Sequence, residues 1–399
     1  MIKIGDLNID KFYLGDTSDA KIYLGDVKVW PKEEEEPGTY PYAFKRVSRG
    51  GSAYTVDCNS TSSNTVSSAD TQSGLSKAEI SGSTSDKTPV SVVFGDCCKT
   101  INSGACSGWT YLTSVTISDN VTSLGESAFY NTLRIEHLKI GSGITYMTNT
   151  FRQIGRSGST KPDLDLSANV GLKLGDGSFD SCYFNNVIFP KNCTLSPNSF
   201  QSCSASTLSF GSGTIISEVG TYSSAFVSSK ISNIDLNGVT LIGDYTFAYT
   251  SGYTSITIPP SVTTFGRSAF FCVSSLNSVT IDYASNATLG ENQFKESSIT
   301  SLTIGSNPTS IGNSMFQKCT KLTSLVIPSN ISSINNSAFY GCSGLTSITV
   351  ESATPPTLGT SVFDDTNNCP IYVPPESVDA YKAANGWSNY KSRIKAIPT

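Results

Sequence analysis

A repeat with a period close to 23 residues dominates this sequence. The stretch from Leu322 to Gly344 reads LTSLVIPSNISSINNSAFYGCSG, and LTSITV begins again at Leu345. An earlier copy, LTSVTISDNVTSLGESAFYNT, begins at Leu112. A period of about 20 to 50 residues is typical of a solenoid, in which each repeat forms one rung and stacked rungs share a continuous core.

Each copy contains a short run in which apolar and polar residues alternate, and its last apolar residue can be followed along the chain. These residues are Phe94, Ile117, Ile140, Leu166, Phe189, Phe210, Leu236, Ile258, Ile281, Ile304, Ile327, Val350 and Val373. Most successive steps are 23 residues, and the exceptions are 26, 21, 26 and 22. We therefore predict a solenoid of about thirteen rungs over residues 91–373, with bulges at the two longer steps, which end at Leu166 and Leu236.

A phenylalanine recurs about half a repeat after each strand. The set is Phe129, Phe151, Phe179, Phe200, Phe226, Phe247, Phe270, Phe294, Phe316, Phe339 and Phe363, with Cys106 at the matching place in the first rung. Because residues alternate sides along a strand, Leu325 and Ile327 are expected to point inward and Val326 outward. Phe339 then closes the far side of its rung. The predicted class is mainly β, with a parallel sheet on one face.

The recurring pattern, LTS followed by an alternating apolar run, often a proline, and then AF-x-x-C, resembles the BspA-type (Treponema pallidum-type) leucine-rich repeat. The resemblance covers roughly residues 90 to 373. The tail IYVPPESVDAYKAANGWSNYKSRIKAI resembles the C-terminal ending of gut-bacterial members of that family. Resemblance to this family implies a leucine-rich-repeat solenoid that serves adhesion or recognition and is not an enzyme.

A different repeat occupies residues 1–30. The segments IKIGD, FYLGD and IYLGD place Gly5, Gly15 and Gly25 ten residues apart. Each predicts a short strand and a Gly-Asp turn, and hence a small β-meander. The motif resembles N-terminal modules in structural proteins of phages that infect gut Bacteroidales, which implies docking to a virion structural protein. A folded cap without a partner is the alternative.

The remaining segments are predicted to link or cap these two parts. Residues 31–38, PKEEEEPG, predict an extended acidic linker. Residues 39–90 are expected to cap the first rung, with a partly mobile spacer as the alternative, because an open rung end would aggregate. Residues 374–399 predict the other cap, with a helix from Glu376 to Ala384 after Pro375. The side chains expected over the last rung are Val378, Tyr381, Trp387, Tyr390 and Ile394.

Composition narrows the class of partner. Only 15% of residues are charged and the net charge is −5, so a nucleic-acid or anionic-membrane footprint is not expected. No run of apolar residues is long enough to insert in a membrane. The first residues, MIKIGDLNIDKFYLGD, lack the apolar core of a signal peptide, which a secreted adhesin should carry unless it has been removed.

The chain has eleven cysteines, an odd number, and four of them follow the repeat. Cys182, Cys203, Cys319 and Cys342 each stand three residues after a repeat phenylalanine, and Cys272 stands two after one. A residue that follows a structural repeat is most simply a small buried hydrophobe. We interpret most of the cysteines as free thiols in a chain made in a reducing cytosol.

Catalytic motifs are missing from the sequence. His137 is the only histidine, so a two-histidine zinc site is excluded, and its strand position predicts an exposed side chain. Neither a G-x-S-x-G elbow nor a P-loop occurs. We therefore predict no enzymatic activity, no metal and no cofactor.

Three carboxylates form the first candidate binding surface. Asp163 and Asp165 are two residues apart on one strand and so face the same way, and Asp235 holds the matching outward position in the Leu236 rung. Such groups could hold a cation or a sugar hydroxyl. A solvated acidic face is the favoured alternative.

Aromatic residues beside the repeat phenylalanines form the second candidate surface. They are Tyr130, Phe184, Tyr249, Phe271 and Tyr340. Exposed aromatics are enriched where proteins bind partners, although some of these must fill the core. Outward Ser and Thr also recur on the strands, as in Ser324 and Ser347; they provide either a hydroxyl-lined surface or sheet stabilisation alone, and we favour the second.

The sequence favours a non-enzymatic recognition protein of a phage tail or fibre, located on the virion. In this hypothesis the solenoid binds a host-surface protein or glycan, and residues 1–30 bind the particle. One alternative is a BspA-like adhesin of the bacterial cell surface. Another is a lectin or carbohydrate-active protein whose site includes Asp163, Asp165 and Asp235. A homo-oligomer is left open.

Overall fold

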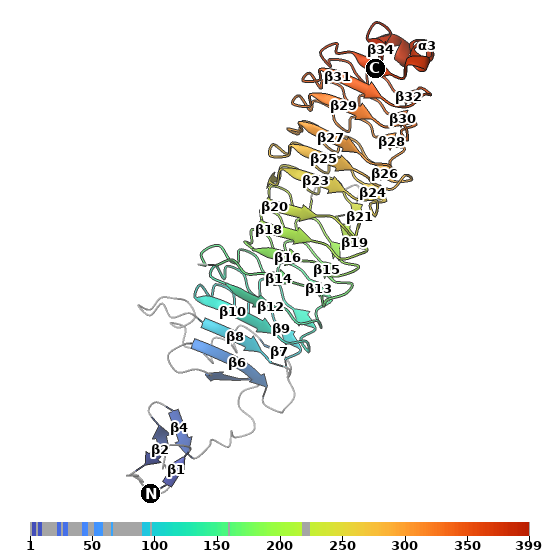
Figure 1. Cartoon of the computed structure of the whole chain (residues 1–399). Coiled ribbons are helices and arrows are strands. Elements are labelled where there is room, and N and C mark those ends of the chain that lie inside the picture. The colour runs from blue at the N-terminus through green and yellow to red at the C-terminus, as the bar shows by residue number, and fades with distance from the viewer. Residues whose placement is uncertain are drawn as a thin grey trace.

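The protein is mainly β, a parallel β-solenoid of about thirteen turns with a short C-terminal helix (Figure 1). The computed structural model describes residues 2–4, 7–9, 22–24, 27–30, 42–46, 52–58, 65–66, 90–95, 98–158, 160–217 and 224–398. The fold class predicted from the repeat is confirmed.

One ladder of parallel strands runs along the solenoid. Its strands are β8 (Val90–Phe94), β10 (Leu112–Ile117), β12 (His137–Lys139), β14 (Leu164–Asp165), β16 (Asn186–Ile188), β18 (Ser204–Ser209), β20 (Lys230–Asp235), β23 (Ser255–Ile258), β25 (Ser278–Ile281), β27 (Ser301–Ile304), β29 (Ser324–Ile327), β31 (Ser347–Val350) and β33 (Ile371–Val373). Each strand ends at, or one residue before, the apolar residue counted in the sequence. The alternation is also confirmed, since Leu325 and Ile327 are buried and Val326 is exposed.

A second parallel ladder, which the sequence analysis did not predict, follows the first along the solenoid (Figure 1). Its strands are β9 (Thr100–Ile101), β11 (Ser123–Leu124), β13 (Tyr146–Met147), β15 (Lys173–Leu174), β17 (Thr194–Leu195), β19 (Thr214–Ile216), β21 (Val239–Ile242), β24 (Thr264–Phe265), β26 (Thr288–Leu289), β28 (Ser310–Ile311), β30 (Ser333–Ile334) and β32 (Thr357–Leu358). Most of these strands have only two residues, and their inward side chain, such as Ile334, enters the core.

The repeat phenylalanines form one stacked column through the core. From Phe129 to Phe363, consecutive rings lie with their centroids 4.8 to 5.9 Å apart and their planes within 26° of parallel. Cys106 takes the matching place in the first rung: it is buried, and its N–H donates to the next rung at Ala128 O. The column ends at Trp387, 5.8 Å from the Phe363 ring.

The far side of each rung, around its phenylalanine, carries a third set of contacts between rungs. The backbone N–H groups of Ser314, Phe316 and Lys318 donate to carbonyl oxygens of the next rung at distances of 2.7 to 2.9 Å. Ser314 and Lys318, two residues before and after the phenylalanine, both have positive φ. Positive φ recurs at these places along the solenoid, mostly at Ser, Asn and Gly, which tolerate it better than branched residues.

The four cysteines that stand three residues after a repeat phenylalanine are buried, as predicted, and they also donate hydrogen bonds, whereas Cys272 is half-buried. The Cys342 thiol donates to the carbonyl oxygen of Phe316 in the preceding rung, 3.1 Å away, and the hydroxyl of Ser297 makes the same bond to Phe270 at 2.9 Å. Cys182, Cys203, Cys319 and Ser229 make equivalent bonds. The position therefore often holds a small side chain that can also donate, although Ile154 and Val273 fill it in two rungs.

The first ladder is interrupted at the longer step that ends at Leu166, where β12 and β14 belong to different sheets, and it is interrupted again between β20 and β23 and between β27 and β29. The extra residues fold back over Tyr183, whose ring is covered by Arg156 at 5.7 Å and Lys161 at 5.6 Å. At the Leu236 step β20 keeps its pairing with β18, and a register shift appears instead between β19 and β21.

The strands at the N-terminus pair as two antiparallel hairpins. β1 (Ile2–Ile4) pairs with β2 (Leu7–Ile9), and β3 (Ile22–Leu24) pairs with β4 (Val27–Trp30). The FYLGD copy and the acidic linker at residues 31–38 lie outside the described residues. The single meander and the boundaries of this module therefore stay predictions.

Three strands are described within the segment predicted to cap the first rung. β6 (Ser52–Cys58) pairs in parallel with β8, and β7 (Thr65–Val66) pairs in parallel with β9, so both ladders extend one step further. β5 (Tyr42–Arg46) is antiparallel to β6 and lies at the end of the sheet.

The C-terminal segment closes the other end. The chain forms a 3-10 turn (Pro375–Ser377), α3 (Val378–Ala383), a second 3-10 turn (Trp387–Tyr390) and β34 (Ile394–Ala396). The predicted helix is confirmed, although its first turn is 3-10. β34 adds to β33 in parallel, one strand beyond residue 373, and the boundary of the solenoid there stays a prediction. Tyr381 and Trp387 are fully buried against the last rung. Within the described residues, no helix is long and apolar enough to cross a membrane.

Replacing one ring of the stacked column should destabilise the solenoid strongly. We expect Phe316→Ala to lower the free energy of unfolding by about 3 to 5 kcal/mol, because it leaves a cavity between two stacked neighbours. Val326→Ala, at a side chain 47% exposed one rung away, should change it by less than about 0.5 kcal/mol. Urea unfolding followed by circular dichroism measures both, and equal losses would contradict the stacking argument.

Burial should also protect most thiols from alkylation. It raises the pKa of Cys193 and Cys342 to about 12, and among the nine described cysteines only Cys272 is not fully buried. At pH 8 a thiol with that pKa is thiolate in about one molecule in ten thousand, and the thiolate is the reactive form. Mass spectrometry after brief iodoacetamide treatment should therefore find Cys272 modified before the other eight. In urea the difference should vanish; rapid labelling of Cys342 in the folded protein would refute the assignment.

Candidate functional site

The outward face of the first ladder carries two rows of side chains. Strand pairing aligns Ser255 with Ser278 and Ser301 in one row, and aligns Thr257 with Thr280 in the other. This confirms that the outward Ser and Thr lie side by side along the sheet. Most rungs therefore present hydroxyl groups to solvent, and a departure from that pattern stands out.

The rows depart from this pattern in the middle of the solenoid. Register places Asp165 beside Ile188, Ile188 beside Ser209, and Ser209 beside Asp235 on successive strands. Asp165 and Asp235 are exposed, and each accepts a hydrogen bond from a backbone N–H two residues further on, Ser167 at 2.9 Å and Asn237 at 3.0 Å. The row thus runs from a carboxylate through an aliphatic side chain and a hydroxyl to a second carboxylate.

Asp163 has a different role from the other two aspartates. One of its carboxylate oxygens accepts from the backbone N–H of Asn186 at 3.0 Å and from the side-chain amides of Asn185 and Asn186 at 3.0 and 2.9 Å. Asp163 therefore ties its rung to the next one. One carboxylate oxygen of Asp163, a residue predicted from the sequence to lie on a binding surface, is therefore occupied by this contact.

The three aspartates do not converge on one point. Three strand spacings separate Asp165 from Asp235, or about 14 Å, which exceeds the separation of paired glycosidase carboxylates. Among the described residues, no group of three or more His, Cys, Asp or Glu could hold a metal ion. The arrangement suits contact with an extended partner better than coordination of one ion.

A shallow hollow of about 480 Å³ lies at the end of this row, where the chain leaves the sheet. Ile188 and Val170, with 40% and 61% of their surface exposed, line it together with Phe189, Phe210 and Lys191. The rings of Phe189 and Phe210 are stacked at 4.7 Å and give the hollow a rigid apolar floor. Sequence analysis missed Ile188 and Val170, because only strand register places Ile188 beside Asp165 and only the folded chain brings Val170 to the same hollow.

The predicted aromatic edge is only partly a surface. Tyr249 is 55% exposed and its ring meets Phe271 edge-on at 5.6 Å, whereas Tyr130, Phe271 and Tyr340 are half-buried. A hydrogen bond to the Asp365 carboxylate raises the pKa of Tyr340. Phe184 is fully buried, so its assignment to this edge was wrong, because its ring packs between Phe179 and Phe200 in the core.

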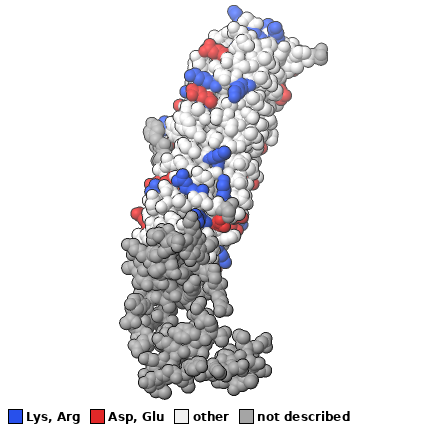
Figure 2. Space-filling view, turned by 90° about the vertical axis from the view of Figure 1, so that its left-hand side faces the viewer, with Lys and Arg blue, Asp and Glu red and all other residues white. Residues whose placement is uncertain are grey.

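Charged side chains are sparse on the face in Figure 2, and acidic and basic groups are interspersed there. Arg152 pairs with Asp180 at 2.8 Å, and Lys318 approaches Glu296 at 3.6 Å. His137 is exposed, as expected. This face of the solenoid therefore has no single-sign patch of the kind that binds nucleic acid or anionic lipid.

The repeat geometry agrees with a comparison against protein families. The family described as the BspA type leucine rich repeat region matches in six copies, over residues 85–157, 172–298 and 287–383, which is more than half of the chain. The chain belongs to the BspA type leucine rich repeat family. Solenoids of this family are typically non-enzymatic surface proteins. No curated protein matches the sequence.

The solved structures that are similar to this BspA type protein include three from bacteria. A leucine rich cell surface protein from Faecalibacterium prausnitzii is 19% identical, with 90% of this chain and 98% of that chain covered and a TM-score of 0.34. A leucine-rich repeat protein from Bacteroides ovatus is 18% identical, with 90% and 99% covered and a TM-score of 0.34. The pneumococcal vaccine antigen PcpA is 12% identical, with 90% and 96% covered and a TM-score of 0.33. At such identities and TM-scores the likenesses carry no argument about function.

Proposed function

We propose that this protein is a non-enzymatic recognition protein of the bacterial cell surface, and that it binds a protein partner through the outward face of its first ladder. The observation that carries the proposal is the apolar hollow at Ile188 and Val170, beside the exposed carboxylates of Asp165 and Asp235 on the outward face of the first ladder. Membership of the BspA type family supports the class of function.

The chemistry of the hollow defines the partner. An exposed aliphatic recess stabilises an inserted apolar side chain, and carboxylates beside it attract basic residues. Asp165 lies one strand from Ile188 and Asp235 lies two, or about 5 and 10 Å away. Two carboxylates outnumber the single amine of Lys191. We therefore propose a protein segment with one apolar anchor flanked by Lys or Arg.

A carbohydrate-active enzyme at the three aspartates is the weaker candidate. Asp163 and Asp165 are exposed and accept backbone N–H bonds, so neither is enclosed as a glycosidase general acid needs to be. Binding of a glycan on this face stays a prediction.

The phage setting finds no support in the family match or in the described fold. Its basis was the repeat within residues 1–30, much of which lies outside the described residues. We therefore place the cell surface ahead of the virion. Binding of residues 1–30 to a virion protein, and formation of a homo-oligomer, stay untested predictions.

Reversing the chemistry of the hollow should weaken partner binding. We expect Ile188→Glu, and separately the double change Asp165→Asn with Asp235→Asn, to reduce adhesion of the labelled full chain to host epithelial cells and to extracellular-matrix proteins. The loss should be about tenfold or more, because the first removes the anchor site and the second removes the attraction for basic residues. Flow cytometry and surface plasmon resonance measure it.

Val326→Glu is the matched control for this test. Val326 is an exposed aliphatic residue in the same row of outward side chains, but it lies far from the hollow. It should leave adhesion unchanged, and unfolding midpoints of all variants should agree. If Val326→Glu lowers adhesion as much as Ile188→Glu, the binding surface is not the hollow.

The location can be tested by peptide mass spectrometry on two preparations, the bacterial surface fraction and purified phage particles. We expect peptides of this chain in the surface fraction, with the solenoid cleaved by protease added to intact cells. Enrichment in particles instead would replace the cell-surface proposal with the virion hypothesis.

A further inference from the structure

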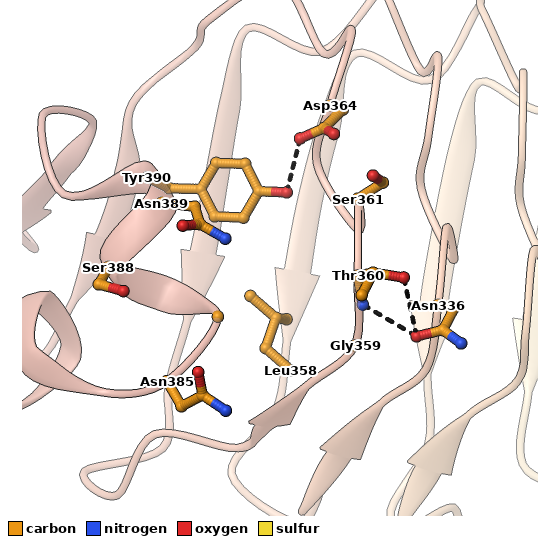
Figure 3. A pocket seen from close by; sticks show the side chains of 11 residues that line it. Asn336, Leu358, Gly359, Thr360, Ser361, Asp364, Asn385, Ser388, Asn389 and Tyr390 are labelled. Carbon is orange, nitrogen blue, oxygen red and sulfur yellow. Dashed lines mark hydrogen bonds between the residues drawn. The ribbon is translucent and has the colours of Figure 1, made fainter.

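A second recess lies at the C-terminal end, between the last turns of the solenoid and the cap (Figure 3). It has a volume of about 470 Å³, within the range of about 300 to 1,000 Å³ that is usual for small-molecule sites. It is distant in sequence from the hollow at Ile188, and neither the sequence analysis nor the family match assigns it.

The cap forms this recess by a close backbone approach. Gly386 has a φ of +78°, and a Cβ atom there would lie 3.0 Å from the carbonyl oxygen of Leu358. Glycine therefore lets the second 3-10 turn reach the end of β32, which brings Asn385 and Ser388 beside the solenoid. Arg393 fixes the cap through bonds to Cys369 O at 2.8 Å and Phe363 O at 3.1 Å.

The lining of the recess is polar but almost uncharged. Three amides, Asn336, Asn385 and Asn389, contribute both donors and acceptors. Four hydroxyls do the same, those of Thr360, Ser361, Ser388 and Tyr390. Asp364 is the one charged group, and the apolar part of the lining comes from the edge of the largely buried Leu358 and from the ring of Tyr390 (Figure 3).

This chemistry excludes charged ligands. No Lys, Arg or His lines the recess, so a phosphate or sulfate group would meet a carboxylate without a cation. A hard cation favours several carboxylates, and only Asp364 is present. A neutral ligand rich in hydroxyl groups fits this lining, because the amides and hydroxyls of the recess can both donate and accept hydrogen bonds.

Part of the lining is held in place before any ligand binds. The amide oxygen of Asn336 accepts from the backbone N–H of Thr360 at 2.9 Å and from its hydroxyl at 3.2 Å, which leaves the amide nitrogen as a donor. The Tyr390 hydroxyl donates to Asp364 at 2.8 Å and orients that carboxylate. The side chains of Asn385, Ser388 and Asn389 are exposed and have no hydrogen-bond partner within the described residues.

We propose that this recess binds a neutral sugar of mono- or disaccharide size. Adjacent hydroxyl groups of the sugar pair with the amides of Asn385 and Asn389 and with the carboxylate of Asp364. The apolar C–H face of the sugar lies on Leu358. The proposal is independent of the protein-binding surface at Ile188, because the two sites share no residue.

Saturation-transfer NMR on the full chain tests this proposal, with glucose, galactose, N-acetylglucosamine, maltose, lactose and cellobiose as probes. We expect at least one of them to bind. Asn385→Ala combined with Asn389→Ala should weaken that binding about tenfold, because two hydrogen bonds are lost. Asn313→Ala, which removes the equivalent amide of Asn336 one rung earlier and outside the recess, should leave it unchanged.

Four results would overturn the proposal. They are the absence of binding by all six probes, an affinity that is the same in the double variant, loss of binding on addition of EDTA, and stronger binding of glucuronate than of glucose. The third would indicate a cation site and the fourth an anion site. Adhesion through Ile188 is measured separately, so failure of one site does not count against the other.

Discussion

The stacked column of phenylalanines is the interaction on which the rest of the structure depends. Its rings repeat at 4.8 to 5.9 Å, close to the spacing of about 4.8 Å between hydrogen-bonded strands, so ring stacking and both strand ladders advance together. If one rung were spaced differently from its neighbours along the solenoid, its strands could pair only if its phenylalanine ring lost its stacking contacts. Extra residues must therefore leave at a corner, as they do where Arg156 and Lys161 cover Tyr183.

Because the core is nearly the same in every rung, specificity has to come from outward positions. Ser and Thr occupy most of them, which suits a half-exposed strand and carries little information about a partner. The row from Asp165 through Ile188 to Asp235 differs in charge, shape and polarity within a few strands. A recognition surface on a solenoid is built in this way, from neighbouring rungs that each contribute one or two side chains.

The ends of the solenoid face a different constraint, since the last rung would expose both its apolar core and its unpaired backbone. β5 lies antiparallel at one end of the sheet, and β34 with the buried Tyr381 and Trp387 closes the other. Trp387 also terminates the ring column against Phe363. Folding this cap against the solenoid creates the polar recess at Asn385 and Asn389, so the same element provides stability and a candidate ligand site.

The sequence by itself determined the class of fold, the positions of the first-ladder strands, the buried phenylalanines and the helical cap, because a 23-residue period repeats every inward side chain in one place. It also identified buried cysteines, although not their hydrogen bonds to the preceding rung. Only tertiary structure decided which outward residues meet. Ile188 and Val170 join through strand register and a turn, Phe184 enters the core, and Asp163 bonds to the next rung. Contacts between rungs depend on residues more than 20 positions apart, and a local pattern carries no information about such pairs.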